Sequence, residues 1–207
     1  MKKLYGNLKM SWICVILFAL AAGAYTGFVM LVPALKNTSF QDIGVLYEWW
    51  VIFAVIIVVN CKKSWEAMLK CFVFFAISQP LVFLVECIFG SLTYELAINY
   101  LRSWMLPILM TLPGGFIAYQ CKKQNVLGAV ILGLGNSIQA FMGIHYVSEV
   151  INNFPYHFLS AIVCFLSIAV MTLSIQKTKR NRIIAILIPA AAMIVVLLFL
   201  NLTGRVL

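Results

Sequence analysis

Long apolar segments separated by short polar stretches make up most of this 207-residue chain. A helix needs about 20 apolar residues to cross the roughly 30 Å hydrocarbon core of a bilayer. Because backbone amides in hydrocarbon must be satisfied within their own segment, each run predicts an α-helix. We therefore expect an all-α, polytopic transmembrane helix bundle of about seven spans. They cover residues 12–35, 45–60, 67–89, 104–120, 126–146, 157–176 and 183–202.

Composition excludes a soluble fold, since 64% of the residues are hydrophobic and only 10% are charged. A soluble domain has about 45–50% apolar and 25% charged residues. No soluble fold of this length has enough interior to bury so much apolar surface. We expect residues 1–207 to form a single integral membrane domain whose solvent is the lipid bilayer.

Lysine and arginine alternate between the two sides of the predicted bundle. One side collects Lys2, Lys3, Lys9, Lys62, Lys63, Lys70, Lys122, Lys123, Lys177, Lys179, Arg180 and Arg182, and the other collects Lys36, Arg102 and Arg205. Short cytoplasmic loops carry such an excess, which predicts the N-terminus inside and the C-terminus outside. The net charge of +9 then needs no nucleic acid as partner. Short lysine-rich loops favour a multi-pass protein of a prokaryotic plasma membrane.

The first span resembles a secretory signal at its beginning, where Met1-Lys2-Lys3 precedes apolar and small residues. Its apolar run continues to Leu35, beyond the about 7–15 apolar residues of a signal, so we favour a retained helix. A repeat is also indicated, because Asn60-Cys61-Lys62-Lys63 and Gln120-Cys121-Lys122-Lys123 lie 60 residues apart. This offset aligns Gln79 with Gln139 and predicts parallel helical-hairpin repeats, although short basic loops also match by chance.

Enzymatic and metal-binding motifs are absent from the sequence. The six cysteines form no CxxC pair, and His145, Glu149 and His157 match no metal-ligand spacing. The chain also lacks nucleophile elbows, phosphate-binding loops and HExxH motifs. We therefore expect neither an enzyme nor a cofactor or metal. Aromatic residues near the outer boundary, such as Trp50, Tyr100 and Trp104, fit an interfacial belt.

Polar side chains at membrane depth give the candidate site, because unsatisfied polar groups in hydrocarbon should face other helices or a wet cavity. Gln79 and Glu86 are two turns apart and share one helix face. Glu86 is a carboxylate inside a span, with Arg102 or His145 as candidate partners; it could also reach the interface as an anchor. The predicted substrate-binding residues are Gln79, Glu86, Thr111, Asn136 and Gln139.

Two alternatives remain open for these polar residues. A stripe of small and polar residues around Asn136 and Gln139 is also typical of a packed helix-helix interface. Prolines and glycines inside spans break helices at transporter sites, but they more often only kink or pack. The predicted hinge residues are Pro80, Pro113, Gly114 and Gly115.

These features favour a small-solute membrane transporter, or the membrane-embedded substrate-binding subunit of one. Its site would lie near the midplane and take a neutral or cationic polar solute. The alternative is a non-transporting membrane protein that assembles with or regulates a partner, with the polar stripe as subunit interface. Because the chain has no ATP-binding signature, energy from ATP would require a separate ATPase partner subunit.

Overall fold

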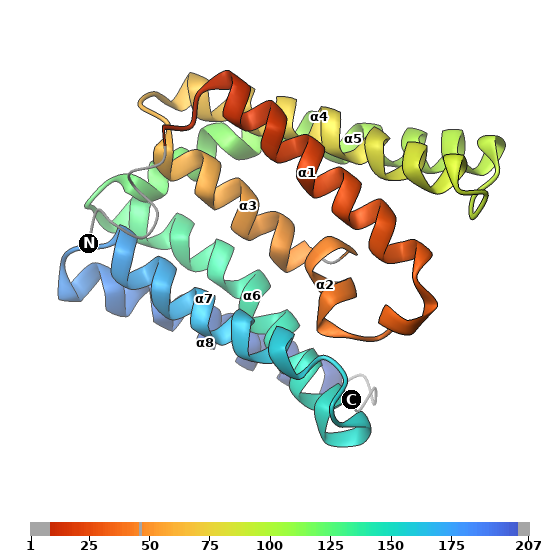
Figure 1. The fold of residues 1–207 in the computed structure, drawn as a ribbon. Helices are drawn as coiled ribbons and strands as arrows, with labels where there is room; N and C mark the ends of the chain where they lie inside the picture. The colour runs from red at the N-terminus through yellow and green to blue at the C-terminus, as the bar shows by residue number, and fades with distance from the viewer. Residues whose placement is uncertain (1–8, 46, 203–207) are drawn as a thin grey trace. The chain divides into compact units, whose positions relative to one another are not determined.

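The computed structural model describes residues 9–45 and 47–202, which contain helices, turns and no β-strand (Figure 1). The elements are α1 (Trp12–Leu31), η1 (Pro33–Leu35), α2 (Ser39–Val45), α3 (Tyr47–Asn60), α4 (Ser64–Ile88), α5 (Tyr94–Ala118), η2 (Tyr119–Lys122), α6 (Val126–Asn153), α7 (Phe158–Ile175) and α8 (Lys179–Leu202). The chain divides into two compact units, Met1–Tyr119 and Gln120–Leu207. We refer to them as unit 1 and unit 2.

The prediction of an all-helical membrane fold is confirmed in its coarse form. Within the described residues, five helical segments are long and apolar enough to cross a membrane: α1, α4, α5 together with η2, α6 and α7. The second predicted span falls on α3, which has only 14 residues. The seventh falls on α8. The count of seven therefore stays a prediction.

The helix boundaries differ most from the predicted spans in α5. The fourth span was placed at residues 104–120, whereas α5 begins at Tyr94 and includes Arg102. Polar side chains did not end this helix, because Arg102 and Ser103 are exposed and leave the packed face unbroken. By contrast, α1 is shorter than the predicted span 12–35. It ends at Leu31, two residues before Pro33 begins the 3-10 helix η1. Proline disfavours the helical conformation in the residue before it, which explains this early end.

Unit 1 is built around the close approach of α1 to α4, which lie side by side in Figure 1. Two glycines four residues apart on α1 make the approach possible. A Cβ atom on Gly23 would lie 2.6 Å from the Ser78 carbonyl oxygen, and one on Gly27 would lie 2.7 Å from the Val85 Cβ. This is the small-residue spacing that allows membrane helices to pack backbone against backbone. Aromatic rings from α1, α3 and α4 fill the adjoining core, including the fully buried Phe74.

A buried cation fastens the start of α1 to α4. Lys70, which the sequence counts among the basic residues of the inner side and includes in the predicted span 67–89, lies inside α4 and is only 3% exposed. Its Nζ donates to the Met10 carbonyl, forms an ion pair with the Glu66 carboxylate at 2.5 Å, and lies 5.5 Å from the centre of the Trp12 ring. These contacts satisfy the ammonium group away from water, as a buried charge requires.

Unit 2 packs α6 against both α7 and α8. Glycines again mark the close contacts: a Cβ atom on Gly143 would lie 3.1 Å from the Cys164 Cβ, and one on Gly133 would lie 2.8 Å from the Ile188 Cβ. Helix α6 begins at an N-cap, where the Asn125 side chain accepts from the Gly128 amide at 2.9 Å.

Lys2, Lys3 and Arg205, which enter the orientation prediction, lie outside the described residues.

Candidate functional site

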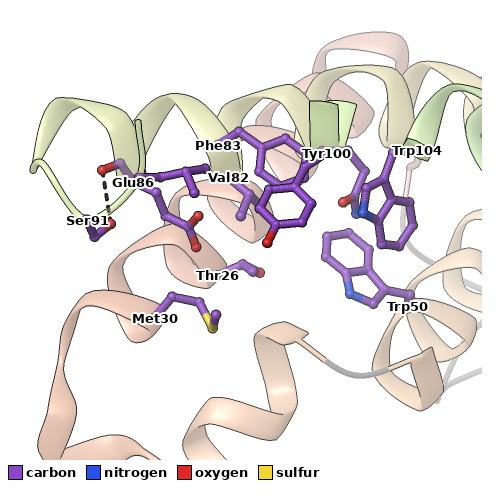
Figure 2. A pocket seen from close by; sticks show the side chains of 11 residues that line it. Thr26, Met30, Trp50, Val82, Phe83, Glu86, Ser91, Tyr100 and Trp104 are labelled. Atoms are coloured by element: carbon purple, nitrogen blue, oxygen red, sulfur yellow. Dashed lines mark hydrogen bonds between the residues drawn. The ribbon is translucent and has the colours of Figure 1, made fainter. Parts of the chain in front are cut away.

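A partly open pocket of about 410 Å³ lies within unit 1 (Figure 2). Its size is in the range of ligand-binding cavities, about 300–1,000 Å³. Residues from α1, α3, α4, α5 and the α4–α5 turn line it. They are Thr26, Met30, Trp50, Gln79, Val82, Phe83, Glu86, Ser91, Leu92, Tyr100 and Trp104.

Helical spacing explains how three helices each present one face to this pocket. Residues three, four or seven apart lie on the same side of an α-helix. On α4 this rule brings Gln79, Val82, Phe83 and Glu86 together. The same spacing of four pairs Thr26 with Met30 on α1 and Tyr100 with Trp104 on α5.

Gln79 is a buried polar residue of the lining. Its side chain is 4% exposed, and its Nε2 is buried without a hydrogen-bond partner. Leaving a buried donor unpaired costs about 1–3 kcal/mol. A hydrogen-bond acceptor entering the pocket would remove this cost, so Gln79 is suited to recognise one.

Glu86 supplies the charge of the pocket. Figure 2 shows its carboxylate pointing into the same space as Thr26 and Tyr100. The backbone carbonyl of Glu86 also stabilises the α4–α5 turn, because Ser91 Oγ donates to it at 3.0 Å. Among the described residues no Lys, Arg or His pairs with the carboxylate, so the ion pair with Arg102 considered from the sequence is not formed. The lining contains no cationic side chain at all.

Four aromatic side chains complete the lining: Trp50, Phe83, Tyr100 and Trp104. Phe83 and Tyr100 are stacked, with ring centroids 6.0 Å apart and planes inclined by 17°. The sequence assigned Trp50, Tyr100 and Trp104 to an interfacial belt and missed their shared pocket. Only the pairing Tyr100–Trp104 carried a local signal, because the two are four residues apart on one helix.

Asn136 and Gln139 lie in the interior of unit 2, both fully buried on α6. Asn136 Nδ2 donates to Thr172 Oγ1 at 3.0 Å and to the Ala185 carbonyl at 3.3 Å. Ser167 Oγ donates to Gln139 Oε1 at 3.1 Å. These contacts tie α6 to α7 and α8, which is the packing role that the sequence left open. The alternative in which this stripe is a subunit interface stays a prediction.

Thr111 does not line the unit 1 pocket. Its Oγ1 instead donates to the Ile108 carbonyl of its own helix at 2.6 Å. The predicted hinges also sit in unbroken helices, because α4 continues through Pro80 and α5 through Pro107 and Pro113. Gly115 packs closely on α4, because a Cβ atom added to it would lie 3.1 Å from the Ala67 carbonyl oxygen. A hinge role for Pro80, Pro113, Gly114 and Gly115 stays a prediction.

Within residues 9–45 and 47–202, no group of three or more His, Cys, Asp or Glu side chains lies together. Comparison with known proteins adds no assignment, because no family model, curated protein or solved structure matches this chain. The chemistry of the unit 1 pocket is therefore the basis for assigning a function.

Proposed function

We propose that this chain is a small-solute membrane transporter, or the membrane-embedded substrate-binding subunit of one, and that the unit 1 pocket holds the solute. The observation that carries the proposal is the pairing of two unsatisfied polar groups on one face of α4. Gln79 Nε2 is a buried donor without a partner, and Glu86 is a carboxylate without a countercharge. Polar groups at membrane depth that serve packing alone are expected to find partners.

The two groups divide the work of binding. Gln79 donates to an acceptor on a neutral or cationic polar solute. Glu86 attracts a cation or carries a proton, because an ionised carboxylate in a low-dielectric site needs neutralising charge. A cycle of proton or cation binding at Glu86 would couple solute movement to an ion gradient. If ATP supplies the energy instead, an ATPase partner subunit must bring it.

Cysteine accessibility tests this proposal with a matched pair of glutamines. In a cysteine-free background, Gln79→Cys in the pocket is expected to react with a water-soluble thiol reagent. Gln139→Cys, which replaces another buried glutamine that is hydrogen-bonded to Ser167, is expected to stay unreactive. Equal silence at both positions would show that no aqueous cavity reaches Gln79 and would overturn the proposal.

Seven spans with the N-terminus inside and the C-terminus outside form the membrane topology of this proposal, in the plasma membrane of a prokaryotic cell. The alternation of basic loops supports it, and the 60-residue offset of the two Cys-Lys-Lys loops supports hairpin repeats. Alkaline phosphatase fused after residue 155 or at the C-terminus is expected to be active, whereas fusions after 63, 123 and 178 are inactive. Activity of the fusion at 155 together with inactivity of the fusion at the C-terminus would show that the seventh predicted span does not cross the membrane.

A further inference from the structure

We infer that the ligand of the unit 1 pocket is a small organic ammonium ion that also carries a hydrogen-bond acceptor. This inference rests on the proposed function and specifies its substrate class. The structure supplies three independent features for such a ligand: a lone carboxylate, several aromatic rings, and a buried donor two helical turns along α4 from the carboxylate residue.

Charge selects a cation. Glu86 is the one ionisable acid in the lining, and the lining has no lysine, arginine or histidine to neutralise it. An anionic solute would meet this carboxylate unscreened, and a neutral solute would leave it to be neutralised by a proton, whereas an organic cation neutralises it directly. A single carboxylate surrounded by aromatic and aliphatic groups is also a poor cage for a hard metal ion, which prefers six or more oxygen ligands.

The aromatic lining favours an organic ammonium over a hydrated ion. Tryptophan and tyrosine faces attract ammonium groups through their negative π-clouds, and such aromatic cages recognise quaternary ammonium ligands. Figure 2 shows Trp50, Tyr100 and Trp104 on one side of the space into which Glu86 points. Rings on one side and a carboxylate on another allow the apolar body and the charge of an ammonium ion to be satisfied together.

The position of Gln79 adds the acceptor to this description. Gln79 and Glu86 are seven residues apart on α4, so their Cα atoms are separated by about 10 Å along the helix axis. We therefore place the cation near Glu86 and the acceptor near Gln79 Nε2, at different ends of the ligand. A carbonyl or ether oxygen several bonds from the nitrogen meets this condition.

Matched probes separate charge from shape. We would measure equilibrium binding to the full chain in nanodiscs for acetylcholine and for 3,3-dimethylbutyl acetate, its neutral carbon isostere. Phenethylamine, protonated at neutral pH, tests whether a primary ammonium serves as well as a quaternary one. At least one ammonium probe is expected to bind about tenfold or more tighter than the isostere, since a charge-assisted contact contributes about 1.5–3 kcal/mol.

Variants locate the binding in the pocket. Glu86→Gln should weaken ammonium binding about ten- to hundredfold and leave the isostere unchanged. Glu95→Gln, which removes an exposed carboxylate of the same unit outside the pocket, should change neither. Tyr100→Leu should weaken ammonium binding about three- to thirtyfold, whereas Tyr100→Phe keeps the ring and the affinity.

The outcomes distinguish the ligand class from the proposed function. Equal binding of acetylcholine and its isostere, or equal effects of Glu86→Gln and Glu95→Gln, would overturn the ammonium assignment. If no ammonium probe binds although Gln79→Cys is reactive, the ligand class is wrong and the aqueous pocket stands. If Gln79→Cys is as silent as Gln139→Cys, both inferences fall.

Discussion

Replacing Gly27 or Gly23 with alanine is expected to destabilise the packing of α1 against α4 by about 1–3 kcal/mol each, the usual cost of overpacking. At Gly23 the added methyl would meet the Ser78 carbonyl oxygen at 2.6 Å, and at Gly27 it would meet the Val85 Cβ at 2.7 Å. Neither neighbour is the free end of a flexible side chain, so one helix must move. Chemical denaturation in a single detergent, followed by circular dichroism, measures the loss.

Gly114→Ala is the matched control, because no atom lies within 4 Å of the position of its Cβ. Alanine is the better helix former by about 1 kcal/mol, so this variant should be as stable as the parent or more stable. The α1 glycines and Gly114 also differ in their effect on the pocket. Thr26 lies between the two α1 glycines and lines the pocket, so moving α1 should reduce ligand binding. Equal stability of Gly27→Ala and Gly114→Ala would contradict the close approach.

The helices were predictable because lipid imposes a strong rule on sequence: long apolar runs must be helical. Their ends were less predictable. Arg102 marked a loop in the sequence, yet α5 carries it on an exposed face. Lys70 lies within the predicted span 67–89, and this charge does not interrupt α4 because Glu66, Met10 and the Trp12 ring surround its buried ammonium group. A charge therefore does not end an apolar helix where it lies on an exposed face, as Arg102 does, or where neighbouring groups compensate it, as they do at Lys70.

The site was predictable where its residues share a helix. Gln79 and Glu86 follow from their seven-residue spacing, and the pocket contains both. Thr26 and Trp50 come from other helices, and no local pattern specified which faces α1 and α3 would present. The Gly23–Gly27 spacing does indicate a close helix contact, but it does not name the partner helix.

The partners of Asn136 and Gln139 were also not predictable from the sequence. Their amides at mid-span required partners, and the sequence did not specify whether a solute or a neighbouring helix would provide them. In unit 2, Thr172 and the Ala185 carbonyl accept from Asn136 Nδ2, and Ser167 donates to Gln139 Oε1, while Asn136 Oδ1 is buried without a partner. The amide donor therefore has protein partners at Asn136 and none at Gln79, a difference that the sequence does not specify.

The buried side chain of Gln176 joins two basic loops of unit 2, and its removal should destabilise the protein strongly. Gln176 is fully buried, and its Nε2 donates to the Cys121 carbonyl at 2.7 Å. Its Oε1 accepts from Asn181 Nδ2 at 3.2 Å. Gln176→Leu leaves both partners unpaired in an interior where each costs about 1–3 kcal/mol. We expect a loss of about 2–5 kcal/mol in the free energy of unfolding.

Gln124→Leu provides the comparison, because Gln124 bridges the same two loops from an exposed position. Its Nε2 donates to the Ile175 carbonyl at 2.8 Å, and its Oε1 accepts from the Lys177 amide at 2.8 Å. Water can replace these bonds, so the loss should be about 1 kcal/mol or less. Cys121 reports the difference independently: as the single cysteine it should become reactive to a soluble thiol reagent in Gln176→Leu and stay protected in Gln124→Leu. Similar losses and similar reactivity in both variants would mean that burial does not set the strength of this junction.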